Sequence, residues 1–209
     1  FLIGTADMGA AKAEEFFKQF RVEGWINNPS ADQDIAIITP ADVLRGGGFG
    51  NNMYGKAALG YLAVKDLLGD DLFKKCLHAY MDRWHGKHPV PWDFFYTFND
   101  AAKKNMHWFW NNWFFSNNYI DYAVKSVVKK GNSYSVAIDN IGGMAAPVNI
   151  IATYDDGSNE SFHQTPAIWE KDQRQAIVTI NAKKKVTSLR LNGGIFMDAD
   201  ESNNSFKAN

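Results

Sequence analysis

The chain has 209 residues, of which 45% are hydrophobic and 22% are charged, the ordinary composition of a globular protein with a buried core. Its 22 Lys and Arg residues nearly balance its 23 Asp and Glu residues, for a formal net charge of −1. This balance provides no strong field for nucleic acid or anionic lipid, so we expect no nucleic-acid partner. No apolar run reaches the roughly 18 residues that a membrane helix needs, so we expect no membrane span.

Helical periodicity dominates the first 117 residues. Residues 6–20 are rich in Ala, Glu and Lys and predict a helix, and the Gly, Asn, Pro and Ser of residues 24–30 predict a loop. The glycine-rich segment 46–52 predicts a flexible turn that leads into a long helix from about Met53. That helix should end at Gly69, because glycine is the residue that most often follows the last helical turn.

Three more helices are predicted in this helical half. Asp70 or Asp71 can cap the first of them, Pro91 suits the first turn of the second, and Asn105 can cap the third. The first is the most clearly amphipathic, with apolar residues at helical spacing: Phe73, Cys76, Leu77, Tyr80, Met81 and Trp84. Because Cys76 is the single cysteine and belongs to this apolar stripe, we expect a buried, unreactive thiol.

After residue 117 the period becomes two. The alternating runs are Tyr122/Val124, Tyr134/Val136/Ile138, Val148/Ile150/Ala152/Tyr154, Ala176/Val178/Ile180 and Leu189/Leu191. Short strands separated by Gly, Asn and Asp turns, with no helix between them, predict an antiparallel Ig-like β-sandwich. The sequence therefore predicts a multidomain α + β protein, with a helical domain over residues 1–117 and a β-sandwich domain over residues 118–209.

Two motifs in the helical half could bind a ligand, and each has a plainer interpretation. Residues 50–56 match the GxxxxGK pattern of a phosphate-binding loop, but Ala57 stands where Ser or Thr would hold magnesium. The βαβ alternation of a nucleotide-binding sheet is also missing. His78, Asp82 and His85 share one helical face and could converge on a metal, but the same spacing describes a solvated face, which is the interpretation that we prefer.

Further candidates follow later in the chain. Residues 198–204 place oxygen-bearing side chains at alternate positions, as a calcium loop does, but Asn203 stands where such a loop has its glycine, so we prefer a polar turn. The aromatic segment 107–115 could stack on sugar rings, but we expect it to pack in the core, because aromatic side chains bury large areas. The chain has no HExxH motif, so we expect no zinc site, no cofactor and no peptidase activity in the chain as given.

An ordered series of motifs runs from about residue 50 to residue 155. In chain order it comprises Tyr54-Gly55-Lys56-Ala57, Leu68-Gly69-Asp70-Asp71-Leu72-Phe73, Leu77-His78-Ala79-Tyr80 with Trp84, Pro91-Trp92-Asp93-Phe94, and the aromatic segment with Trp108-Phe109 and Trp113-Phe114. The series resembles the part of aminopeptidase-N-type (gluzincin) zinc metallopeptidases that follows the zinc-binding segment, and the β segment after it, to about residue 155, resembles the sandwich module that often follows their catalytic domain. The family motif is Tyr-x-Lys-Gly, so Ala57 is a small-for-small departure.

The resemblance implies both a fold and a function. The helical half would be the C-terminal part of a thermolysin-like catalytic domain, and the intact enzyme would hydrolyse a peptide substrate with metal-activated water. Tyr54 would be catalytic, donating a hydrogen bond to the tetrahedral oxyanion, whereas Lys56 would mark the motif. The zinc ligands and the general base would lie N-terminal to Tyr54, and residues 1–53 contain no His. We therefore expect a fragment of a larger peptidase, or a descendant that lost its metal.

The start of the chain and its Trp-rich helix bear on location and on a rival function. The chain begins with Phe1 and shows no secretory leader, so we expect that something upstream was removed, and the resemblance suggests a secreted or periplasmic protein. The rival hypothesis is a non-catalytic helical plus Ig-like module that binds a glycan or a protein partner. Exposed, coplanar rings of Trp108, Trp110 and Trp113 would favour this binding module, and buried rings would favour the peptidase scaffold. The sequence indicates no oligomeric state.

Overall fold

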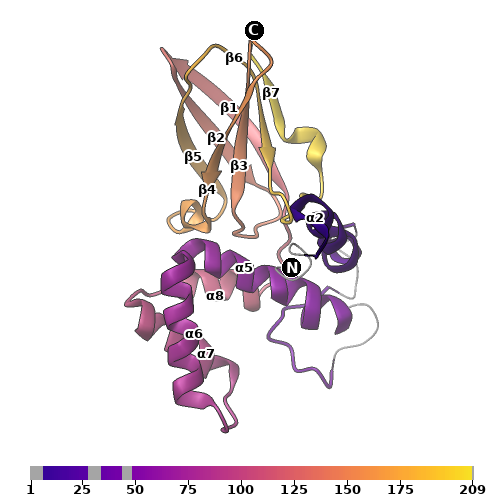
Figure 1. The fold of residues 1–209 in the computed structure, drawn as a ribbon, viewed down its shortest axis with the longest axis vertical. Coiled ribbons are helices and arrows are strands. Elements are labelled where there is room, and N and C mark those ends of the chain that lie inside the picture. The colour runs from indigo at the N-terminus through magenta and orange to yellow at the C-terminus, as the bar shows by residue number, and fades with distance from the viewer. Residues whose placement is uncertain (1–6, 28–33, 44–48, 209) are drawn as a thin grey trace.

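The computed structural model describes residues 7–27, 34–43 and 49–208 and consists of a helical part and a β part (Figure 1). The strands stand above a layer of helices, and α5 and α8 lie across the lower ends of the sheets. Among the described residues, the last α-helix ends at Phe114 and the first strand begins at Tyr122. The predicted α + β class is therefore confirmed, and the predicted domain boundary after residue 117 falls within this connection.

The N-terminal helical run extends further than its sequence predicts. Helix α2 (Ala10–Phe17) continues through a wide π-helical turn, η1 (Lys18–Val22), into α3 (Glu23–Ile26). Gly24 lies inside α3, so the loop predicted to begin there is wrong for this stretch, and the remainder of that loop lies largely outside the described residues. Burial of Trp25 beside it offsets the low helix propensity of glycine.

The second helical run also begins earlier than predicted. Residues 49–50 are already helical, and a second π-helical turn, η2 (Asn51–Lys56), leads into α5 (Ala57–Leu68). The flexible turn predicted over residues 46–52 is therefore wrong from residue 49 onward, and its earlier residues lie outside the described part. The helix ends at Gly69, whose positive φ of 76° confirms the expected glycine stop.

The three remaining predicted helices are present as α6 (Asp70–Trp84), α7 (Pro91–Ala102) and α8 (His107–Phe114). The predicted cap of α6 is wrong, because Asp70 is its first helical residue. Its carboxylate pairs with the ammonium of Lys65 at 2.8 Å instead of capping the helix. No helix within the described ranges has both the length and the apolar content to cross a membrane.

Asn105 and Cys76 lie close to their predicted places on these helices. Asn105 lies one position before the N-cap, Met106, yet its side chain still accepts a hydrogen bond from the N–H of His107 at 3.0 Å. Cys76 is fully buried, with its sulfur 3.9 Å from the carbonyl oxygen of Phe98. Burial raises the pKa of the Cys76 thiol, which confirms the expectation of a buried thiol with little tendency to form the reactive thiolate.

The aromatic segment of α8 packs in the core, as expected. Trp110 and Trp113 are 1% and 0% exposed, and Trp108 is half-buried against the same core. The ring of Trp110 stacks on Phe95 of α7, with centroids 5.1 Å apart. These rings therefore do not form the exposed, coplanar platform that sugar stacking requires.

The β part contains two antiparallel sheets. One sheet has the order β1-β2-β5, from β1 (Tyr122–Lys130), β2 (Ser133–Asn140) and β5 (Gln175–Asn181). The other has the order β4-β3-β6-β7, from β4 (Asn159–Gln164), β3 (Val148–Tyr154), β6 (Val186–Asn192) and β7 (Ser205–Lys207). Every second residue of β2 and of β3 is buried, and both sets belong to one hydrophobic core. The period-two pattern therefore predicted the buried faces correctly.

Hydrogen bonds from α8 join the helical part to the β part. The Asn112 amide donates to the carbonyl of Gly143 at 2.8 Å and to the side chain of Gln173 at 2.9 Å, and it accepts from the N–H of Ala145 at 2.7 Å. Trp113 donates its ring N–H to the carbonyl of Ala145 at 2.8 Å. Because both side chains are buried, these bonds hold the two parts in one fixed arrangement.

Replacing Asn112 with Ala should lower the free energy of unfolding by about 2 kcal/mol, because the buried N–H of Ala145 loses its acceptor. Urea denaturation followed by circular dichroism measures this loss. The neighbouring exposed Asn111→Ala is the matched control and should change stability by less than about 0.5 kcal/mol. Equal effects of the two substitutions would contradict the assigned role of Asn112.

The C-terminal segment 198–204 is a polar turn, as we expected, and includes the short 3-10 helix η4 (Glu201–Asn203). Its packing on the start of β1 was not predicted. The Asp198 carboxylate accepts hydrogen bonds from the N–H groups of Tyr122 and Asp200, both at 2.9 Å. Burial raises the pKa of Asp198 to about 6, these bonds oppose the rise, and the nearby negative charge of Asp121 adds to it.

The raised pKa of Asp198 has a consequence for stability. The folded state holds the Asp198 proton more tightly than the unfolded chain does, so binding of this proton stabilises the fold. This contribution to the free energy of unfolding is present below about pH 4 and is lost as the pH rises through about 6. Asp198→Asn removes the titration. We expect the stability of the variant relative to the original chain to improve by about 2–3 kcal/mol between pH 4 and pH 7. Urea denaturation at several pH values tests this, and a pH-independent difference would contradict it.

Candidate functional site

The wide turn η2 presents Tyr54 to solvent while it buries neighbouring positions. The Tyr54 side chain is 54% exposed, whereas Asn52, Gly55 and Lys56 are buried. A π-helical turn displaces its residues relative to a regular α-helix and is frequently found at functional sites. Tyr54 is thus an exposed phenol on a turn whose other side is anchored in the protein.

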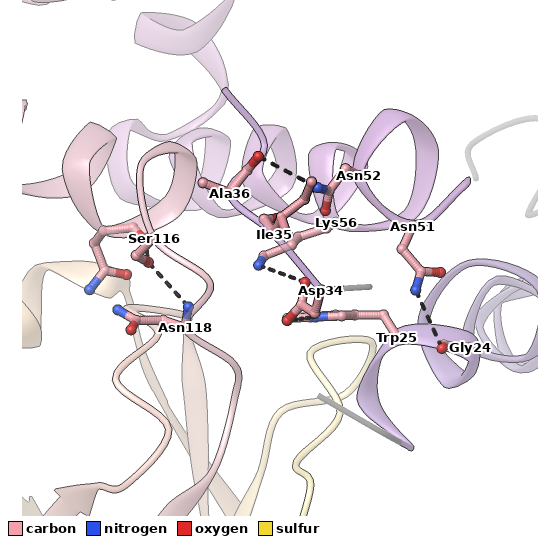
Figure 2. A network of polar contacts seen from close by, with 11 residues as sticks. Gly24, Trp25, Asp34, Ile35, Ala36, Asn51, Asn52, Lys56, Ser116 and Asn118 are labelled. Atoms are coloured by element: carbon pink, nitrogen blue, oxygen red, sulfur yellow. Dashed lines mark hydrogen bonds and ion pairs between the residues drawn. The ribbon is translucent and has the colours of Figure 1, made fainter. Parts of the chain in front are cut away.

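Lys56, the charged residue of the Tyr54 motif, is fully buried in a polar network (Figure 2). Its Nζ lies 3.3 Å from Oδ1 of Asp34, and it also lies 5.3 Å from the centre of the Trp25 ring. The ring N–H of Trp25 donates to the other Asp34 oxygen at 3.2 Å. The carboxylate therefore neutralises the lysine and satisfies the indole at the same time.

The electrostatics of this pair reflect two opposing effects. Burial raises the pKa of Asp34 and lowers the pKa of Lys56, because desolvation disfavours each charge. The attraction between the two charges opposes both shifts. Each residue therefore depends on the other to remain charged inside the protein.

Two further contacts hold the same turn. Asn52 donates its side-chain N–H to the carbonyl of Ile35 at 2.7 Å, which fixes the turn to the segment that carries Asp34 (Figure 2). Gly55 lies against η1 so closely that a Cβ at this position would be 2.2 Å from the carbonyl oxygen of Arg21. Only glycine permits this approach, which brings the two π-helical turns into backbone contact.

The outer surface of the turn borders a small hollow. The guanidinium of Arg21 lies over the Tyr54 ring, 5.6 Å from its centre. A hollow of about 220 Å³ lies between η1 and η2 at this point, lined by Phe20, Arg21, Gly24, Gly50, Asn51, Tyr54 and Gly55. A phenol hydroxyl and a guanidinium thus border one concave surface, where they can donate hydrogen bonds to an oxygen that carries negative charge.

The two other candidate ligand sites, for which we preferred a plainer interpretation, do not have the geometry of a binding site. Residues 49–56 are helical, so the GxxxxGK segment is not the open loop that cradles phosphate. His78 and Asp82 are exposed on α6, and His85 is exposed directly after the helix ends. Within the described ranges, no three His, Cys, Asp or Glu side chains are grouped so that they could hold a metal ion.

A larger concave surface lies elsewhere in the helical part. It is an apolar groove of about 800 Å³ between α5, α6, α7 and residues 37–40, and Tyr61, Leu77, Tyr80 and Phe94 contribute to its walls. This groove could not be predicted from local sequence patterns, because its lining comes from segments far apart in the chain. Asp34 and Trp25 were not among the predicted site residues either. Lys56 was the sequence signal that could have pointed to Asp34. A lysine that is buried within a helix requires an acidic partner.

Comparison with known proteins provides a relationship at the level of the fold. No protein-family model matches this sequence, and no curated protein matches it. Among solved structures, 57 chains match. One of them is Legionella pneumophila aminopeptidase A in complex with aspartic acid, which has 13% sequence identity and a TM-score of 0.52 over 90% of this chain. The chain spans 26% of the length of that protein, so its fold is similar to one part of an aminopeptidase.

The close contact at Gly55 can be tested directly. Gly55→Ala should lower the free energy of unfolding by about 2–3 kcal/mol, because the added methyl group meets the backbone of η1 and one of the two turns must move. Gly50→Ala is the matched control. Gly50 directly precedes the turn, and among the described residues no atom beyond its chain neighbours and its own helix backbone lies within 4 Å of the added methyl group. This substitution should leave stability unchanged or raise it by up to about 1 kcal/mol. Urea denaturation of both variants measures the difference, and similar effects would contradict the assignment.

Proposed function

We propose that this chain belongs to a zinc-dependent aminopeptidase of the gluzincin class and that Tyr54 is the catalytic residue which it contributes. The observation that carries the proposal is the exposed phenol of Tyr54 on a turn anchored by Lys56, Asn52 and Gly55. The ordered motif series and the fold similarity to part of an aminopeptidase support it. Because fold alone does not imply function, the proposal rests on this site.

The chemistry that we assign to Tyr54 is hydrogen-bond donation to developing charge. In such a peptidase, zinc would activate the water that attacks the peptide carbonyl. The described residues offer no group that fits a zinc ion, so the proposal assigns the ligands and the general base to a segment outside this chain. Tyr54 would donate its phenol O–H to the carbonyl oxygen as that oxygen becomes negative. A phenol is suited to this role because it is an O–H donor that stays protonated near neutral pH.

Further parts of the proposal concern the substrate and the location. A peptide with a free amino terminus is the substrate class that follows from an aminopeptidase, and the helical part would form one wall of its cleft. We also propose a thermolysin-like catalytic domain, an Ig-like second domain and a secreted or periplasmic location. The Ig-like domain is supported by the period-two strand pattern and by the two antiparallel sheets that share one core. The thermolysin-like domain and the location are supported by the motif resemblance alone.

The rival function, a glycan-binding or protein-binding module, has less support. It depended on exposed rings of the Trp-rich helix, and Trp110 and Trp113 are buried in the core. Trp113 also uses its ring N–H to bind the carbonyl of Ala145 in the β part. Helix α8 therefore connects the helical part to the β part through buried contacts and does not present a binding surface.

Tyr54→Phe tests the catalytic assignment in the protein that carries this chain together with its zinc-binding segment. Removing one oxyanion donor should lower kcat for an aminoacyl substrate by about 10²–10³-fold, because the lost hydrogen bond is made in the transition state. Stability should change little, since the exposed ring remains. Steady-state kinetics and urea denaturation provide the two measurements.

Tyr96→Phe is the matched control, because Tyr96 is an equally exposed phenol on α7, at 56% against 54% for Tyr54. It should leave kcat unchanged. Wild-type turnover in Tyr54→Phe would contradict the catalytic role. A similar loss in both variants would show that the effect is not specific to the Tyr54 hydroxyl.

A further inference from the structure

The charge on Lys56 calls for an explanation beyond stability. Its ammonium is 0% exposed, and the carboxylate of Asp34 is also almost fully removed from water. A buried ion pair commonly stabilises a protein no more than apolar side chains of similar size would, because desolvation offsets the attraction between the charges. An apolar residue at position 56 could fill the same space. The pair must therefore have a role that apolar side chains cannot fill.

Charged hydrogen bonds differ from apolar contacts in that they impose direction. Asp34 receives the ammonium of Lys56 on one oxygen and the ring N–H of Trp25 on the other, at 3.3 and 3.2 Å. These residues come from three separate segments, namely η2, the stretch after residue 33 and α3. Apolar side chains could slide past one another by fractions of an ångström, whereas two bonds to one carboxylate select a single arrangement.

The segments joined in this way are those that surround Tyr54. Lys56 follows Tyr54 by two residues on the same turn, and Asn52 precedes it by two. Asn52 holds the carbonyl of Ile35, the residue directly after Asp34, so both ends of the turn are tied to the same short stretch (Figure 2). Gly55 also abuts the carbonyl of Arg21. The backbone that carries the phenol therefore has little freedom to shift.

We infer that Lys56 and Asp34 are positioning residues that set the place of the Tyr54 hydroxyl, and that their charges are retained for this geometry rather than for stability. The inference rests on the proposed function, because it assumes that the hydroxyl acts in catalysis. A shift of a catalytic group by about 1 Å costs up to about 10²-fold in rate. Loss of the pair should therefore lower kcat by about 10–100-fold and change KM by less than about threefold.

The test uses the protein with its zinc-binding segment and removes both charges at once. Single substitutions are unsuitable, since each leaves one buried charge unpaired and destabilises the fold for that reason alone. In Lys56→Met with Asp34→Asn, no buried charge is left, and the Asn amide oxygen still accepts from the Trp25 ring N–H. We expect this variant to unfold at a urea concentration close to that of the original protein while kcat falls. Wild-type kcat at retained stability would overturn the inference.

A matched control removes an ion pair of the same type from the surface. Lys65 and Asp70 lie 2.8 Å apart, on α5 and α6, and both side chains are exposed. Lys65→Met with Asp70→Asn should leave kcat, KM and the unfolding midpoint unchanged. A fall in kcat equal to that of the buried-pair variant would also overturn the inference, because the effect would then not depend on the position of the pair.

Combination with Tyr54→Phe separates positioning from a general structural role. If the pair acts through the Tyr54 hydroxyl, its removal should lower kcat by less than about twofold once the hydroxyl is absent. A structural role would instead multiply the two losses. Should Tyr54→Phe alone keep full activity, the proposed function fails. If Tyr54→Phe is slow and the losses multiply, only the positioning role fails.

A second variant covers the case in which the neutral pair does not fold. Lys56→Arg keeps the positive charge opposite Asp34, but it replaces a compact ammonium with a larger planar group. We expect a folded protein with lowered kcat, and again little further loss in the Tyr54→Phe background. Circular dichroism verifies folding. Wild-type kcat in a folded Lys56→Arg variant would overturn the inference.

Discussion

A lysine ammonium with no exposure to water requires a compensating charge, and this requirement at Lys56 shapes the candidate site. Asp34 supplies the negative charge and also accepts a hydrogen bond from the ring N–H of Trp25. One buried charge thereby joins η2 to α3 and to the short stretch that begins at Asp34. The backbone contact between Gly55 and Arg21 brings the two π-helical turns together on another side. Tyr54 remains exposed because its neighbours on the turn make these contacts.

Helix α5 connects the candidate site with the β part. Helix α5 continues directly from the Tyr54 turn and passes α8 at Gly60, where an added Cβ would lie 3.3 Å from the Trp113 ring. Trp113 and Asn112 bind the backbone of the β part through buried hydrogen bonds. A further link runs from Asp66 of α5 to His163 of β4, at 2.9 Å. The candidate catalytic residue therefore lies on a rigid framework, which suits a group that must be held in position.

Periodicity predicted most of the regular structure, because it records which side of an element faces the core. The helices α5 to α8 and the alternating burial of β2 and β3 follow from it. Two predictions from local residue preferences were wrong. The segment from Gly24 suggested a loop and Asp70 suggested a cap, but burial of Trp25 and the ion pair with Lys65 decided otherwise. Local propensities amount to about 1 kcal/mol or less, so tertiary contacts readily override them.

By itself, the sequence determined the α + β class, the buried aromatic helix and the motif that contains Tyr54, since each depends on residues close together in the chain. The tertiary structure decided which residues surround that motif. Asp34 and Lys56 are 22 positions apart, and no local pattern pairs them. Their contact exists because burial of the lysine leaves a carboxylate as its only adequate partner, and the fold brings that carboxylate within 3.3 Å.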